Sequence, residues 1–234
     1  MSHPPIHAQS RNEAGNIIVY VLLGIILLGL LTVALRNAGG GQDNIDTESL
    51  ILKAGQTQRY AAELAKGVSI LLENHVSEAD IRFAHPDAAT DYGTITTNPE
   101  NQVFDVTAGR ATYQPPPDGI NDGSAWEFFG TSAIPQVGSD KAELIAVLPN
   151  VTPEFCQAMN TQLGFDSGSQ PTDDANGSPS CVMGGSTDRF DGTFDDASPN
   201  PLDDTSFSRL PAYQACVLCA SDSSYNYYYV LMAR

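Results

Sequence analysis

Basic residues are scarce in this chain. Its 234 residues include 11 lysines and arginines against 28 aspartates and glutamates, which gives a formal net charge of −17 at pH 7. Every acidic residue except Glu13 lies beyond Arg36, so the excess negative charge belongs to the region after that point. A surface of this kind repels phosphate backbones, and we therefore expect no nucleic-acid partner.

The sequence also lacks the motifs that mark common catalytic sites. It has no G-x-S-x-G, H-E-x-x-H, P-loop or dinucleotide-binding pattern. Of its four histidines, His3 and His7 precede the apolar segment described below, and His75 and His85 stand in no recognisable catalytic arrangement. We therefore expect no enzyme, and we assign no catalytic residue and no cofactor from the sequence.

Cysteine is absent from the first 155 residues, and the four cysteines then follow as Cys156, Cys181, Cys216 and Cys219. An even number of cysteines behind an apolar segment is typical of two disulfides in an oxidising compartment, and three pairings are possible. A zinc site with four cysteine ligands is the alternative, because Cys216 and Cys219 form a C-x-x-C pair. Disulfides are favoured because Cys156 and Cys181 form no second pair of that kind.

What the sequence does contain is one long apolar stretch, at residues 15–36. No charged residue occurs between Ile17 and Leu35, and a helix rising ~1.5 Å per residue over that length spans roughly the ~30 Å hydrocarbon core of a bilayer. The stretch is longer than the apolar core of a cleaved secretory signal, and no convincing cleavage site follows it. The sequence therefore predicts a retained single-pass transmembrane helix.

This helix divides the expected organisation of the chain. Residues 1–14 form a short polar leader, residues 37–46 a glycine-rich hinge, and residues 47–234 one folded domain. Arg11 and Arg36 flank both ends of the helix, so charge alone does not orient it. The shortness of the leader and the paired cysteines place the leader in the cytoplasm and the acidic domain in the periplasm or outside the cell.

An amphipathic helix of about seven turns is predicted to begin at Asp46 or Thr47. A coiled-coil neck is the alternative, but Gly55 and Gly67 favour close packing of this helix on its own domain. Its expected buried face has apolar or small residues in steps of three and four, namely Leu50, Ala54, Thr57, Ala61, Leu64, Val68 and Leu71.

Beyond this helix the residues favour a meandering antiparallel sheet, with strands expected at 102–106, 111–114, 125–129 and 143–148. Trp126, Phe128 and Phe129 are the expected core of that sheet. Thr152 and Pro153 start a second helix that stops at Gly164. The fold class is therefore α+β, with the amphipathic helix packed on the sheet.

The C-terminal residues 225–234 have high strand propensity and alternate in a way that covers both faces, which predicts a strand in the middle of the sheet. An exposed adhesive stripe of tyrosines is the alternative. The two expected faces are Tyr225, Tyr227, Tyr229 and Leu231 on one side, and Tyr228, Val230 and Met232 on the other.

Residues 165–208 are rich in Asp, Gly, Ser and Pro, and they form an acidic irregular loop that Cys181 is expected to hold in place. A solvated loop is the main interpretation. The alternative is a calcium site, because Asp188, Asp191, Asp195 and Asp196 alternate with small residues that would let oxygen ligands surround Ca²⁺. The spacing matches no EF-hand loop.

The chain begins with a short polar leader and a glycine, followed by an apolar helix that continues as an amphipathic helix. A sheet and a disulfide-tied acidic region come next. This order resembles the type IV pilin and type II secretion pseudopilin group. The resemblance implies cleavage by a prepilin peptidase between Gly15 and Asn16, a place in the bacterial inner membrane, and a pilin-like fold. The group usually has a hydrophobic residue after the glycine and a Glu five residues after the cut, where this chain has Asn16 and Tyr20. Subunits that cap a filament tip can lack that Glu.

Two functional hypotheses follow from the resemblance and the sequence. The first is a structural subunit of a cell-envelope filament or secretion apparatus, which assembles with itself or with other pilin-like subunits through the apolar helix. The second is a free-standing membrane-anchored ectodomain that binds a partner through the acidic loop or the tyrosine-rich strand. Cleavage after Gly15 distinguishes them.

Overall fold

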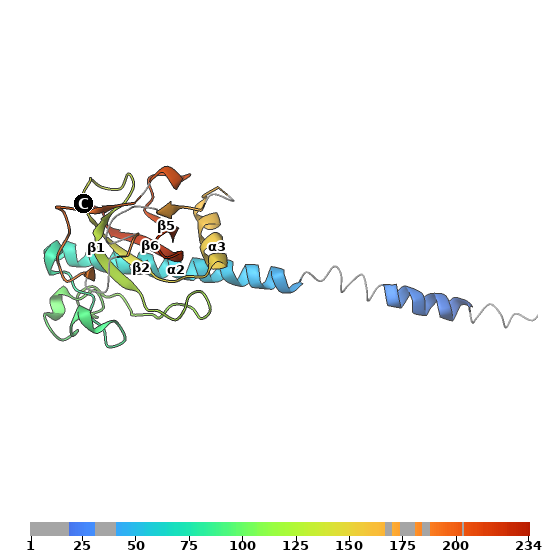
Figure 1. Ribbon diagram of the computed structural model, residues 1–234. Helices are drawn as coiled ribbons and strands as arrows, with labels where there is room; N and C mark the ends of the chain where they lie inside the picture. Colours follow the sequence, from blue (N-terminus) through green and yellow to red (C-terminus); the bar gives the residue numbers. More distant parts are fainter. Residues whose placement is uncertain (1–18, 31–40, 167–169, 174–180, 184–187, 203) are drawn as a thin grey trace, which may run out of the picture. The chain divides into compact units, whose positions relative to one another are not determined.

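The computed structural model describes residues 19–30, 41–166, 170–173, 181–183, 188–202 and 204–234 (Figure 1). The chain divides into two units, Met1–Asp46 and Thr47–Arg234. The described part of the first unit consists of a helix over residues 19–30 and the beginning of helix α2. The second unit is the α+β domain, and it contains every other element described below.

Helix α2 spans Gly41–Glu73 and so begins earlier than the sequence predicted. Residues 41–46 of the expected hinge are helical, and residues 37–40 lie outside the described part of the chain. The reason is that glycine weakens a helix only where it occurs: after Gly41 neither glycine nor proline follows until Gly55, so nothing in the sequence stops a helix there.

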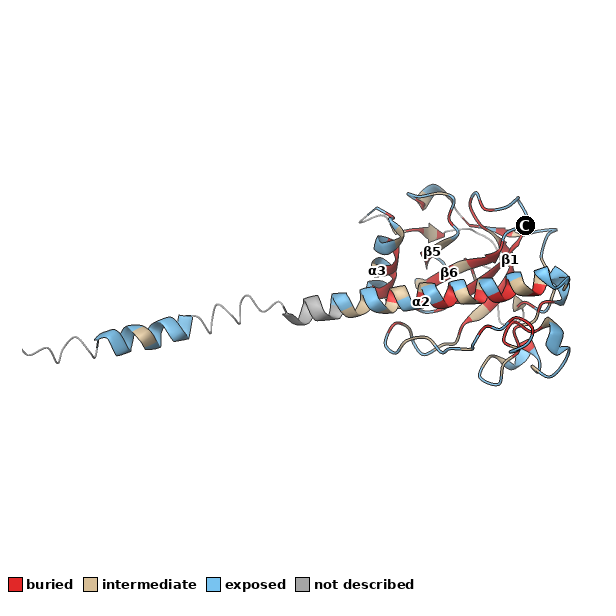
Figure 2. Cartoon of the chain, turned by 180° about the vertical axis from the view of Figure 1, so that it is seen from behind, coloured by how far each residue is buried: buried red, intermediate tan, exposed pale blue. Residues whose placement is uncertain are grey.

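The predicted face of α2 is buried against the domain, as Figure 2 shows along the part of the helix beside the sheet. The helix lies close to its neighbours at Gly67, where an added Cβ would meet Val103 Cγ1 at 3.1 Å and Gly109 O at 3.2 Å. The prediction that this helix packs on its own domain is therefore confirmed, and the alternative of a coiled-coil neck is not. The predicted face residues Ala54, Thr57, Ala61, Leu64, Val68 and Leu71 are at most 1 % exposed, and Leu50 is partly buried.

The sheet has six strands in the order β3-β5-β6-β2-β1-β4. Its four central strands pair antiparallel, and the two short edge strands β3 and β4 pair parallel to their neighbours. The expected central position of the C-terminal strand is confirmed, because β6 lies between β5 and β2. The strands are β1 Glu127–Ala133, β2 Glu143–Leu148, β3 Thr172–Asp173, β4 Asn200–Pro201, β5 Gln214–Cys219 and β6 Ser224–Met232.

Each face of the sheet has its own hydrophobic core. Helix α2 and the segment that follows it cover one face, where Phe128 and Tyr227 are buried. The irregular segment around Cys181 covers the other face, where Phe129 and Tyr228 are buried. Alternate residues of each strand point to opposite faces, and both cores are therefore built from the same strands. The alternative of an exposed tyrosine stripe is wrong for Tyr227 and Tyr228, because neither side chain has any exposed surface.

Strand β6 departs from strict alternation at its end. Met232 was expected on the face of Tyr228 but lies in the core of Tyr227. The cause is a bulge: Leu144 pairs with Met232 and Ile145 with Val230, so β6 contains one extra residue at this point.

Two of the predicted strands, 102–106 and 111–114, do not form. Within residues 102–111 the backbone instead closes a compact turn, in which Gly109 N donates to Gln102 O and Ala111 N to Val103 O. Only Gln102 makes a bridge, to Arg82. Val103 and Phe104 are buried because they pack against α2 and the aromatic core, and their apolar character therefore does not indicate a strand.

Helix α3, Pro153–Leu163, begins and ends as the sequence predicted. The Thr152 side chain accepts a hydrogen bond from Phe155 N, Pro153 occupies the first turn, and Gly164 ends the helix in a left-handed conformation with φ of 79°. This helix carries Cys156 into the core beneath α2. The irregular segments also contain three-residue 3₁₀ helices, namely η1 Glu78–Asp80, η2 Thr90–Tyr92, η3 Pro99–Asn101 and η5 Asp204–Ser206.

Candidate functional site

The expected processing residues Gly15 and Asn16 lie outside the described residues, so cleavage between them stays a prediction. Tyr20, at the position where pilins usually carry a Glu, belongs to the helix over residues 19–30 and is 67 % exposed. In the portion of the chain that the structure describes, none of the helices combines the length and the apolar character needed to cross a bilayer. The predicted span of 15–36 extends past both ends of this helix into residues outside the description.

All four cysteines form disulfides, Cys156 with Cys216 and Cys181 with Cys219. This confirms the disulfide prediction over the zinc alternative and selects one of the three pairings. Both bonds end on strand β5, one on each face of the sheet. Asn160 reinforces the first bond from α3, because its amide accepts from Cys216 N at 2.9 Å and donates to Cys216 O at 2.8 Å.

The four aspartates proposed as calcium ligands do not form one cluster. Over the described residues, no group of three or more Asp, Glu, His or Cys side chains is arranged to hold a metal ion. Asp191 accepts from Thr193 N and Asp195 from Ser198 N, so both carboxylates cap local turns. The hydrogen bond from Thr193 lowers the pKa of Asp191. Asp188 also has an interaction partner.

Asp196 serves a different purpose from the one the sequence suggested. Its carboxylate accepts from Arg234 Nη1 at 2.6 Å, and Lys141 Nζ lies 3.7 Å away. The hydrogen bond from Arg234 lowers the pKa of this carboxyl. Arg234 also donates to Glu78 and stacks 3.9 Å over the ring of Phe194. This part of the acidic loop is therefore fixed to the end of the chain by ion pairs.

A second cation fixes the loop to the sheet. Arg189 donates to Glu127 Oε1 at 2.7 Å and pairs with Asp91, and its side chain is only 19 % exposed. Glu127 is the first residue of β1, and Phe190 N donates to Phe128 O one residue further along. Two arginines thus connect the acidic segment to the rest of the domain: Arg189 of the segment pairs with Asp91 and Glu127 outside it, and Asp196 of the segment pairs with Arg234.

Glu143, at the start of β2, is a carboxylate with no exposed surface. Its Oε2 accepts from Ile134 N at 2.8 Å, while Oε1 has no hydrogen-bond partner within the described part of the chain. Burial favours the neutral form of an acid and raises the pKa of Glu143 to about 7. No sequence signal marks this residue, because its environment is built by the 134–138 turn.

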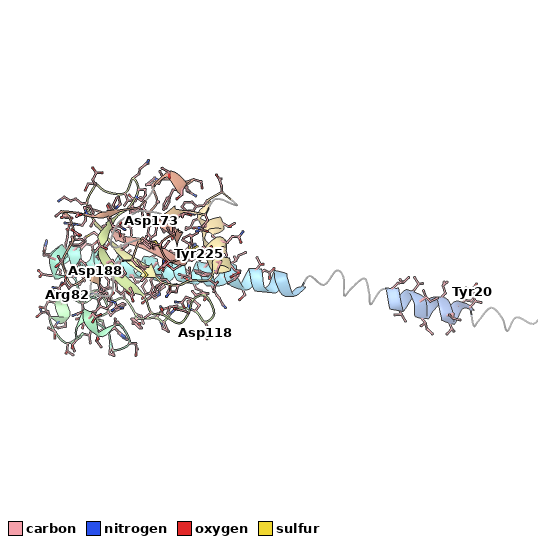
Figure 3. All side chains as sticks on the ribbon, in the orientation of Figure 1. Tyr20, Arg82, Asp118, Asp173, Asp188 and Tyr225 are labelled. Carbon is pink, nitrogen blue, oxygen red and sulfur yellow. A yellow bond between two sulfur atoms is a disulfide. The ribbon has the colours of Figure 1, made fainter. Side chains whose placement is uncertain are left out.

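A cleft of about 480 Å³ lies between α2 and the proline-rich segment 114–117. We call it the α2–proline cleft. Gln56, Arg59, Tyr60 and Glu63 line it from the helix, Pro115 and Pro117 line it from the segment, and Trp126 lies at its base. Lys53 Nζ donates to Asp118 O at 2.9 Å and so holds the chain just after this segment beside the helix. Figure 3 marks the position of Asp118.

Trp126 and Tyr60 form the interior of the α2–proline cleft. Their rings meet edge to face with centroids 5.5 Å apart, and Trp126 is only 1 % exposed. The Trp126 Nε1–H has no acceptor among the residues that the structure describes. A buried donor left in that state costs about 1–3 kcal/mol, so its presence in a native fold calls for an explanation.

The sequence could not identify this cleft. Trp126 was expected in the core, which is confirmed, but its neighbours on α2 are more than 60 residues away in the chain. Comparisons with protein-family models, with curated proteins and with solved structures find no match for the chain. Function is therefore argued from the residues themselves.

Proposed function

We propose that this protein is a pilin-like or pseudopilin-like structural subunit, anchored in the bacterial inner membrane by residues 15–36 and built into a cell-envelope filament or secretion apparatus. The observation that supports this proposal is the packing of α2. One face of this helix, from Ala54 to Leu71, is buried on an antiparallel sheet of its own domain. A long helix fixed in this way suits a filament subunit in which the apolar segment before the helix contacts neighbouring subunits.

The surface of α2 just before the buried face supports contact with other subunits. Ile51 is 45 % exposed and Leu52 is 68 % exposed, although both are large apolar residues. Ile51 O accepts from Gln162 Nε2 at 2.7 Å, so α3 fixes the helix at this point. Exposed apolar side chains at a rigid position are suited to burial against a neighbouring copy.

Processing of the leader is the first test. Mass spectrometry of the intact chain, purified from membranes of cells that contain a prepilin peptidase, should show the loss of residues 1–15. A Gly15→Leu variant should keep its full length, because the peptidase of the pilin group cuts after a glycine. Recovery of the complete chain in cells with the peptidase, and no change on its deletion, would favour the free-standing ectodomain.

Contact between copies is the second test. All four native cysteines are in disulfides, so a Leu52→Cys variant carries one free thiol. Mild oxidation of membranes should join Leu52→Cys chains to each other or to a second subunit. The matched control is Val106→Cys, since Val106 is 84 % exposed but belongs to the 102–111 turn and not to α2. Equal cross-linking of the two variants, or none in either, would contradict assembly through this helix.

A further inference from the structure

We propose that the α2–proline cleft binds a small carboxylate whose body is a ring. This inference concerns the folded domain alone and does not depend on the proposed role in a filament. It is carried by three properties of the cleft: two aromatic hydrogen-bond donors without an acceptor in the described structure, one arginine without a carboxylate partner among the described residues, and apolar rings in its walls.

The donors come first. The Trp126 Nε1–H has no acceptor in the described structure, although the side chain is almost fully buried at the base of the cleft. The Tyr60 hydroxyl accepts from Gln114 N at 3.1 Å, which leaves its own proton available. Burial raises the pKa of Tyr60, so this hydroxyl stays a donor at physiological pH. A ligand that satisfies the Tyr60 hydroxyl must supply an acceptor. The Trp126 nitrogen itself is buried, so the same ligand reaches its N–H only when the side chains around it move.

The charges indicate which acceptor. Arg59 lines the cleft, and none of the ion pairs or hydrogen bonds formed by the described residues uses its guanidinium. A guanidinium fits a carboxylate with two parallel hydrogen bonds, which makes a carboxylate the preferred acceptor. Glu63 lies one turn further along α2, and its negative charge disfavours an anionic ligand. Thr112 N donates to Glu63 Oε1 at 2.7 Å and fixes this carboxylate in place. Removing the Glu63 charge should therefore strengthen binding.

The walls and the size of the cleft indicate the ligand body. Tyr60, Pro115 and Pro117 line the cleft, and apolar rings of this kind suit a ligand ring that packs against them. The volume of about 480 Å³ falls within the range of ligand sites, roughly 300–1,000 Å³. Two kinds of molecule share the required chemistry: a sugar acid, with a pyranose ring, and an aromatic acid. The side chains of Gln56 and Gln114 can bond the hydroxyls of a sugar acid, which an unsubstituted aromatic acid lacks.

The chain contains a single tryptophan, and it lies in this cleft, so its fluorescence reports directly on the site. The full chain in detergent is titrated with glucuronate and with benzoate, and with glucose and benzamide as neutral counterparts. We expect at least one acid to change Trp126 emission saturably, with the neutral counterpart at least tenfold weaker. A larger response to glucuronate identifies a sugar-acid site, and a larger response to benzoate an aromatic-acid site. Ligand-observed NMR gives a second, label-free measurement of the same binding.

Three variants test the assignment of charges. Arg59→Gln should weaken binding of the acid at least tenfold, and Glu63→Gln should strengthen it several-fold. Lys66→Gln is the matched control, because Lys66 is an exposed cation on the same helix and does not line the cleft. It should leave the affinity unchanged. Thermal unfolding of each variant shows whether the fold is kept.

Several results would overturn the proposal. The absence of saturable binding of both acids up to about 100 mM, by fluorescence and by NMR, would show that the cleft holds no such ligand. Equal affinity for an acid and its neutral counterpart would remove the role of the carboxylate. Equal weakening by Arg59→Gln and Lys66→Gln would reduce the effect to general electrostatics of an acidic domain. None of these results bears on cleavage after Gly15 or on cross-linking at position 52.

Discussion

Replacing Cys156 and Cys216 together with alanine is expected to lower the free energy of unfolding by about 4 kcal/mol. The bond closes a sequence separation of 60, and most of its effect is the restriction of the unfolded chain, which grows slowly with loop length. Both sulfurs are fully buried, so alanine also leaves a small void. Urea unfolding followed by Trp126 fluorescence measures the change.

The matched comparison is the double replacement of Cys181 and Cys219. This bond closes a separation of 38, so the chain-entropy effect is smaller by less than about 0.5 kcal/mol. A large difference between the two double variants would therefore report native packing, since Cys156 lies in a helix and Cys181 in an irregular segment. A loss below about 1 kcal/mol for the first pair would contradict its stabilising role.

Replacing Glu143 with glutamine is expected to stabilise the protein above neutral pH and to remove part of its pH dependence. The pKa of Glu143 is raised from 4.5 to about 7 in the folded state. Between these two values the native state keeps a proton that the unfolded state releases, and stability therefore falls as the pH rises. The loss is complete above about pH 7 and amounts to at most about 3 kcal/mol. Below about pH 4.5 both states are protonated and the residue contributes no dependence.

The glutamine keeps an acceptor for Ile134 N but never ionises. Urea unfolding at pH 5, 6, 7 and 8 should show a falling stability for the native protein and a flatter profile for Glu143→Gln. Glu100→Gln serves as the control, because Glu100 is an exposed acid in η3 whose removal changes the same formal charge. Identical slopes for the native protein and Glu143→Gln would show that this carboxyl is not the source of the dependence.

Local signals in the sequence were sufficient for some elements of the fold. The residues Thr152, Pro153 and Gly164 each act within one turn of α3, and both ends of that helix were predicted correctly. The spacing on α2 was also sufficient, because a helix face is decided by its own sequence. The strand β5 was missed, since its cysteines were read only as a C-x-x-C pair. In a strand, residues three apart point to opposite faces, which is why Cys216 and Cys219 have different partners.

Contacts between distant segments set the limit of prediction at the candidate sites. Asp196 looked like a calcium ligand because its partner Arg234 is far away in the chain, and nothing local shows that the two pair. The environment of Glu143 depends on the turn near Ile134 in the same way. The α2–proline cleft joins three separate segments, and no single one of them contains a recognisable motif.

The two disulfides interlock along the chain, because Cys181 lies between Cys156 and Cys216, while Cys219 lies beyond both. As a result, a single cut in the backbone anywhere from Cys156 to Cys219 leaves the two pieces covalently joined by at least one bond. The acidic segment 165–208 falls within that interval. A nicked molecule would therefore remain one molecule, separating into fragments only after reduction.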